Sequence, residues 1–111
     1  MKVLDVVDAA SRAVQANPSR PATAILHDTD QARMVVFRIA PGQQVAEHTS
    51  TSSVSLVTIS GTGVVSGAEG EHPVKVGDLA TFAPGEPHGM RAEADTLVLL
   101  AVITPRPGAR P

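Results

Sequence analysis

The segment that decides the fold is Gly77-Asp78-Leu79-Ala80-Thr81-Phe82-Ala83-Pro84-Gly85-Glu86-Pro87-His88. It leads from a glycine turn through a short apolar run and a second turn to a single histidine. A similar layout occurs earlier, in Pro41-Gly42-Gln43-Gln44-Val45-Ala46-Glu47-His48. Glycine and proline are typical of tight turns, because glycine tolerates a positive φ and proline fixes its own φ. Each segment therefore predicts a turn followed by a histidine on a strand.

From residue 22 onward, short β-rich runs alternate with turn residues. The runs cover residues 22–26, 33–39, 54–59, 64–65, 74–76, 79–82 and 96–103. The first two flank Asp28-Thr29-Asp30, which predicts a hairpin. No helix-length segment separates the runs, so a parallel sheet is excluded. The pattern predicts an all-β sandwich, jelly roll or barrel.

The N-terminal segment has a different periodicity. Residues 3–16 place apolar side chains at the spacing of an amphipathic helix, which Asn17-Pro18 ends. Its polar face is not basic, so it is predicted to be a packing element or a dimer contact rather than a membrane anchor. The predicted organisation is a helix and linker over 1–20, a barrel over 21–104 and a flexible Pro-rich tail over 105–111.

Composition narrows the range of partners. The 111 residues make one domain with a net charge of -2, and the basic residues are scattered. Nucleic acid is not expected as a partner, because phosphate binding needs clustered Lys and Arg. Cysteine is absent, and no long apolar run indicates a signal peptide or membrane span. We therefore expect a cytoplasmic protein without a membrane partner.

The two histidine segments resemble the two sequence motifs of the cupin superfamily. Gly42, His48 and Gly61 match the first motif. The second motif is matched by Gly77-Asp78, Gly85 and His88, with Pro84 one place from the usual proline. The likeness covers about residues 35–103. It implies a small single-domain cupin, a double-stranded β-helix (jelly-roll barrel) that holds a ligand or metal in its cavity and commonly forms a homodimer.

The first motif departs from the family pattern at two positions. Ser50 stands in place of the second histidine and Val54 in place of the glutamate, so only His48 and His88 remain of the four metal ligands that the resemblance implies. Metal sites generally use at least three protein ligands. Two alternatives stay open: one divalent ion (Fe, Mn, Ni, Cu or Zn) on His48 and His88, with Met90 or Glu86 as a third ligand, or no metal.

Strand alternation predicts which side chains line the cavity. If His48 points inward, every second residue after it also does, and Met90 follows His88 in the same way. The predicted lining is mostly apolar with a few polar groups, which is typical of a small-molecule site. Its members are His48, Ser50, Val54, Leu56, His88 and Met90.

Three functions are compatible with this lining. The first is binding of a small molecule without a metal, the second is a metal-dependent enzyme such as a dioxygenase or isomerase, and the third is a structural role with an unused cavity. His27 and His72 are predicted to lie outside the site, and Glu47 is predicted to face outward. The Ser/Thr-rich stretch 49–53 lacks the neighbouring residues of a catalytic nucleophile.

Overall fold

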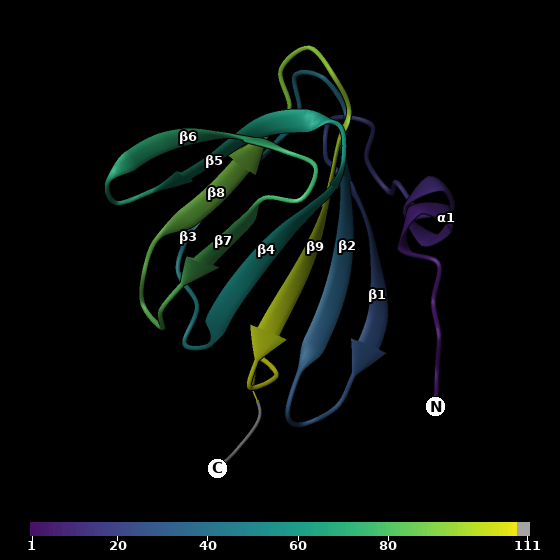
Figure 1. The fold of residues 1–111 in the computed structure, drawn as a ribbon, viewed down its shortest axis with the longest axis vertical. Helices are drawn as coiled ribbons and strands as arrows, with labels where there is room; N and C mark the ends of the chain where they lie inside the picture. The colour runs from purple at the N-terminus through teal and green to yellow at the C-terminus, as the bar shows by residue number, and fades with distance from the viewer. Residues whose placement is uncertain (109–111) are drawn as a thin grey trace.

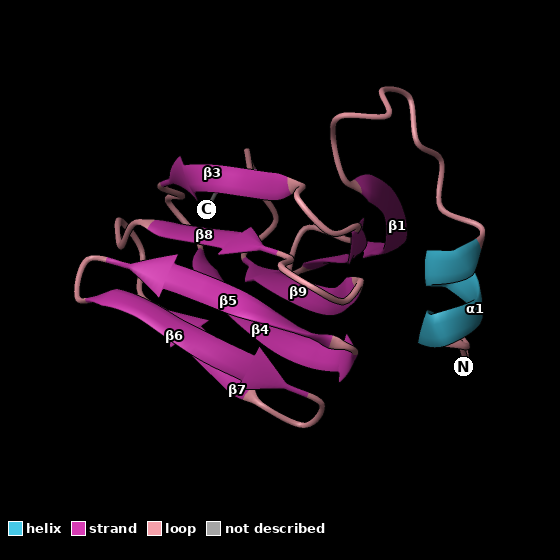
Figure 2. Cartoon of the chain, turned by 90° about the horizontal axis from the view of Figure 1, so that it is seen from above, coloured by secondary structure: helices cyan, strands magenta, loops and turns pink. Residues whose placement is uncertain are grey.

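The structure is a computed structural model that describes residues 1–108 and contains two antiparallel sheets packed face to face (Figures 1 and 2). One sheet has the strand order β1-β2-β9-β4-β7 and the other β3-β8-β5-β6. The prediction of an all-β double-stranded β-helix with a short N-terminal helix is confirmed. The elements are α1 (Val6–Ser11), β1 (Ala22–Asp28), β2 (Arg33–Ile39), β3 (Gln44–His48), β4 (Ser53–Ser60), β5 (Thr62–Gly67), β6 (Gly70–Lys75), β7 (Leu79–Phe82), β8 (His88–Arg91) and β9 (Leu97–Thr104).

The chain crosses repeatedly from one sheet to the other, so the two sheets form the walls of a barrel that is seen from above in Figure 2. β6 and β7 are each the last strand of their sheet, and they lie on the same side of the barrel. Among residues 1–108, neither has a hydrogen-bonded neighbour beyond it. The barrel is therefore open between β6 and β7.

The core fills the space between the sheets. Every second residue of β4 and β9 points inward, because side chains alternate along a strand. Leu97 and Leu99 of β9 are 0% exposed and pack against residues of the other sheet, among them Val65 and Met90. These contacts make one continuous apolar cluster across both sheets.

The helix is shorter than the predicted range 3–16. The Asp5 side chain accepts a hydrogen bond from the Asp8 main-chain N–H and caps the helix at Val6. Beyond the helix, Val14 forms an isolated β-bridge with Thr23. A short helix gains most of its stability from packing. Val3 is 86% exposed and so gains little from packing, and the helix is limited to residues 6–11.

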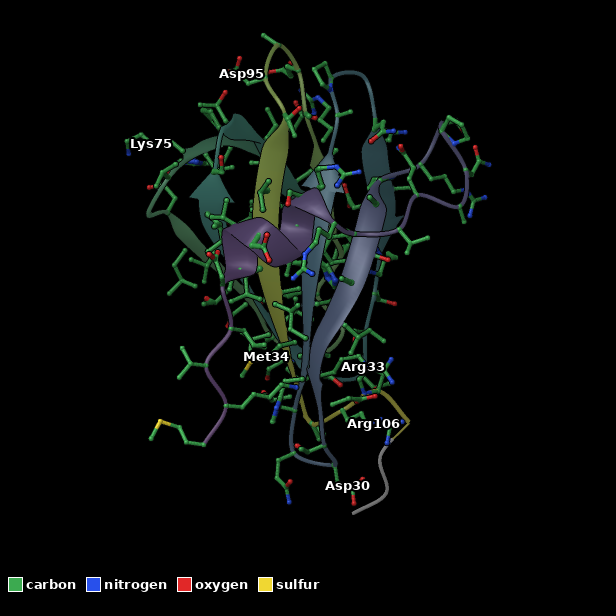
Figure 3. The ribbon with its side chains drawn as sticks, turned by 90° about the vertical axis from the view of Figure 1, so that its right-hand side faces the viewer. Asp30, Arg33, Met34, Lys75, Asp95 and Arg106 are labelled. Atoms are coloured by element: carbon green, nitrogen blue, oxygen red, sulfur yellow. The ribbon has the colours of Figure 1, made fainter. Side chains whose placement is uncertain are left out.

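Packing holds α1 against the outer face of the five-stranded sheet (Figure 3). Ala10 is buried against Val36 and Val98, which form a second, smaller apolar cluster. The Arg38 guanidinium donates hydrogen bonds to the main-chain oxygens of Ala10 and Ser11 at the end of the helix. The helix thus covers part of one sheet and lies away from the opening between β6 and β7.

The chain beyond β9 contacts the barrel through its first two residues. The Ser52 hydroxyl donates to the Pro105 carbonyl oxygen at 2.6 Å, and Arg106 Nε lies 3.0 Å from an Asp28 carboxylate oxygen. Figure 3 shows Arg106 beside Arg33 and Asp30. Residues 109–111 of the predicted tail lie outside the described residues. Within residues 1–108, no helix has the length and apolar character needed to cross a membrane.

Candidate functional site

The two motif histidines meet at one end of the barrel. His48 is the last residue of β3 and His88 the first of β8, and the two are paired across the strands. A register shift between Val45 and His48 places one extra residue in β3, which keeps His48 opposite His88. Their ring centroids are 4.3 Å apart with the planes tilted by 60°. His88 is 4% exposed, whereas His48 is exposed to solvent.

Main-chain carbonyls fix the orientation of both imidazoles. Nδ1 of His48 lies 3.0 Å from the Ala46 oxygen, and Nδ1 of His88 lies 3.0 Å from the Glu86 oxygen. A carbonyl oxygen only accepts, so each Nδ1 carries the proton and donates it. In the neutral form each Nε2 then has a free lone pair. The pair therefore offers two nitrogens that can accept a hydrogen bond or ligate a metal.

Three of the other predicted cavity residues are part of the packed core. Val54, Leu56 and Met90 are 2–4% exposed and belong to the main apolar cluster. They point between the sheets, as alternation requires, and contact other apolar side chains there. They therefore belong to the core and do not line an open cavity.

Ser50 connects two loops at the histidine end. Its main-chain oxygen accepts from the Gly85 N–H at 2.8 Å, and its hydroxyl accepts from the Ser52 N–H at 3.1 Å. Residues 49–52 lie between β3 and β4, which belong to different sheets. The segment 48–58 is therefore not one continuous strand, contrary to the assumption behind the predicted alternation.

The donor set at this end does not fit a divalent metal held by the protein alone. Of the two candidates for a third ligand, Met90 lies in the core, and Glu86 Oε1 accepts from the Ala83 N–H at 3.1 Å. Within residues 1–108, no three side chains of His, Asp or Glu come together as a metal-binding group. Two imidazoles alone fall short of the three ligands that such sites generally use.

A large open groove lies beside the histidine pair, between the free edges of β6 and β7. This groove has a volume of about 1270 Å³. Its apolar floor comes from inward-facing residues of both sheets, Val65, Val74, Ala80 and Phe82. This groove was not predicted, because the sequence pattern did not reveal the inner faces of β5 and β6. The signal was the run Gly70–Lys75, of which only the last part was predicted to be a strand.

His72 lies in this groove. It is paired with Val65 across β5 and β6 and lines the open side. His72 was predicted to lie outside the site. Its Nδ1 lies 2.6 Å from the Pro73 oxygen.

Phe82 lies between the groove and the histidine pair. It lines the groove, and its ring centroid is 5.1 Å from that of His88. Gly67, the strand partner of His88, faces the same ring: a Cβ at Gly67 would lie 3.4 Å from Phe82 Cε1. The aromatic ring thus separates the groove from the histidine pair.

Asp78 fixes the turn that carries the chain from β6 to β7 at the other end of the groove. Its carboxylate accepts from the Lys75 N–H at 2.9 Å, and its main-chain oxygen accepts from the Thr58 N–H. The hydrogen bond from the Lys75 main chain, followed by the Lys75 side chain and the charge of His72, holds the pKa of Asp78 below its ordinary value of 3.8.

This pKa shift predicts a pH dependence of stability. A lowered folded-state pKa stabilises the fold above the unfolded value of 3.8, and this contribution is lost as the pH falls below 3.8 through the folded-state pKa. We expect Asp78→Asn to unfold at a lower temperature than wild type at neutral pH and to lose less stability between about pH 5 and about pH 3. Thermal unfolding followed by circular dichroism measures both. Asp30→Asn, at an exposed carboxylate, is the control; equal acid sensitivity of Asp78→Asn and wild type would contradict the assignment.

Comparisons with known proteins place this barrel in a family. A family model described as a cupin domain matches residues 35–104, so the chain belongs to the cupin family. A solved structure from Thermus thermophilus, the protein TT1209, is 28% identical, with 96% of this chain and 100% of that chain covered and a TM-score of 0.83. An RmlC-like cupin from Desulfovibrio desulfuricans is 24% identical (95% and 97% covered, TM-score 0.80).

A third solved structure, called a predicted oxalate decarboxylase, comes from Thermotoga maritima. It is 26% identical, with 76% of this chain and 79% of that chain covered and a TM-score of 0.71. No protein with curated function matches the chain. The family and the fold are established by these likenesses.

Proposed function

We propose that the chain binds a small organic molecule inside its open barrel, in the groove between β6 and β7, with a polar group directed toward the histidine end. The observation that carries this proposal is the groove itself, about 1270 Å³ with an apolar floor that ends at Phe82 against the His88 ring. Small-molecule sites generally combine a concave apolar surface with a few convergent polar groups. The free Nε2 atoms of His48 and His88 are such groups.

The alternative is a metal-dependent cupin enzyme such as a dioxygenase or isomerase. Its support is the imidazole pair, with ring centroids 4.3 Å apart and both Nδ1 atoms bound to carbonyls. Carbonyl-bound Nδ1 is the usual arrangement behind a metal-ligating Nε2. The two imidazoles lack a third protein ligand, so we prefer binding without a metal.

The test of ligand binding is a ligand-observed NMR screen of a small-metabolite library against the wild-type protein. Hits are then titrated against His88→Ala and against His27→Ala, a control histidine on β1 away from the groove. We expect His88→Ala to weaken binding by up to about tenfold, the effect of one lost hydrogen bond, and His27→Ala to leave it unchanged. No binding by any compound, or equal effects of the two variants, would favour the structural role.

The test of the alternative is metal analysis of untagged protein incubated with Fe, Mn, Ni, Cu or Zn and then dialysed. We expect no stoichiometric metal. One equivalent of metal that is lost in both His48→Ala and His88→Ala would overturn the metal-free proposal.

The oligomeric state, the location and the absence of nucleic-acid and membrane partners remain predictions. The homodimer rests on the family resemblance and on the apolar residues of α1, among which Val7 is 55% exposed. Analytical ultracentrifugation measures the oligomeric state directly. A cytoplasmic location and the absence of nucleic-acid and membrane partners rest on composition alone.

A further inference from the structure

The charges around the groove are unevenly distributed. The charged side chains that line it are Glu69, Lys75, Asp78, Glu86 and Glu93. Four are carboxylates and one is an ammonium group. The lining therefore has an excess of negative charge, which disfavours an anionic ligand.

At the Asp78 end the carboxylates of the groove have cationic partners. Lys75 Nζ lies 3.4 Å from Asp78 Oδ1, and Arg91 Nη2 lies 3.4 Å from Glu93 Oε2. Figure 3 shows Lys75 at the end of the barrel opposite Arg106. Arg91 also pairs with Glu71, so the negative charge of this end is partly balanced by these two cations.

The other end, beside Phe82 and His88, carries two carboxylates without a cation. Glu69 lies in the turn between β5 and β6, and Glu86 in the turn between β7 and β8, which lie on the same side of the barrel (Figures 1 and 2). Strand pairing joins the two turns, because Gly67, which precedes the first, is paired with His88, which follows the second. Neither glutamate forms an ion pair within residues 1–108.

The remaining groups at this end also suit a cation. The Phe82 ring lines the groove there, and an aromatic face attracts an ammonium group. The His88 ring lies next to Phe82, with the ring centroids 5.1 Å apart. Further along, Val65, Val74 and Ala80 offer a surface for an apolar body.

We infer that the ligand of the groove is an amine with an apolar body, whose cationic head lies among Glu69, Glu86 and Phe82. This inference rests on the proposed function, since it names the ligand class of the same groove. The apolar body contacts the floor between the sheets. Carboxylates and phosphates are selected against.

The test compares three probes that share one body and differ in charge: 2-phenylethylamine, 2-phenylethanol and phenylacetate. Each is titrated into ¹⁵N-labelled protein at low salt, and the amide shifts of Val65, Ala80 and Phe82 are followed. We expect the amine to bind about tenfold tighter than the alcohol, with about threefold from each glutamate, and phenylacetate to bind weakest. Added NaCl should reduce the difference, because exposed charges are screened.

The variants Glu69→Gln and Glu86→Gln should each reduce the preference for the amine over the alcohol by about threefold. Glu47→Gln is the matched control, since Glu47 is an exposed glutamate of β3 that does not line the groove. Equal or tighter binding of phenylacetate would overturn the inference and leave the proposed function standing. If none of the three probes shifts the groove amides, the inference falls, and the library screen alone decides the proposed function. Should a variant fail to fold, the salt titration of the wild type still tests whether charge causes the preference for the amine.

Discussion

Replacing Gly61 with alanine is expected to lower the free energy of unfolding by about 4 kcal/mol, the range of the most damaging single substitutions. Gly61 stands between β4 and β5, where the chain crosses from one sheet to the other, and has a φ of +75°. A Cβ there would overlap the Thr96 main-chain oxygen and lie 2.9 Å from its carbonyl carbon. Main-chain atoms at the start of β9 cannot move aside without disturbing the core strand.

The loss at Gly61 has two causes, the contact with Thr96 and the strain of a positive φ, and Gly42→Ala separates them. Gly42 has a φ of +84°, but a Cβ there would meet nothing within 4 Å. It should therefore cost only the strain of a left-handed conformation, about 1–2 kcal/mol. Urea unfolding followed by circular dichroism measures both variants. Similar losses at the two glycines would show that contact with Thr96 is unimportant.

The second large effect is expected from Leu99→Ala. Leu99 is 0% exposed at the centre of β9, which is hydrogen-bonded to both β2 and β4. Removal of its side chain leaves a cavity between the sheets, and such substitutions cost about 3–5 kcal/mol.

The control for this prediction is Leu79→Ala, since Leu79 is a strand leucine that is 61% exposed. Loss of an exposed side chain should change the free energy of unfolding by less than about 1 kcal/mol. The same urea titration compares the two. A loss at Leu79 as large as that at Leu99 would contradict the assignment of the core.

The strands were predictable because their signals are local. The runs 33–39 and 79–82 match β2 and β7 to the residue, since each is bounded by turn residues. The length of the helix was overestimated. The apolar spacing of residues 3–16 does not reveal that only Ala10 and its neighbours contact the sheet. That contact depends on tertiary structure.

The candidate site was predictable only in part. The resemblance indicated His48 and His88, and the structure brings their rings together. The groove could not be predicted from the motifs. It is formed by β6 and β7, which come to lie on the same side of the barrel only when the two sheets pack. Phe82 belongs to the second motif segment, but its contact with His88 depends on the same packing.

The open side between β6 and β7 has a consequence for the evolution of such barrels. The side chains at its rim, such as those of Glu69 and His72, are exposed and lie outside the apolar cluster that holds the sheets together. Mutations there change the surface offered to a ligand at little cost to folding, because surface substitutions are generally close to neutral for stability. One fold can therefore acquire new binding preferences through substitutions at a few rim positions while its apolar core stays the same.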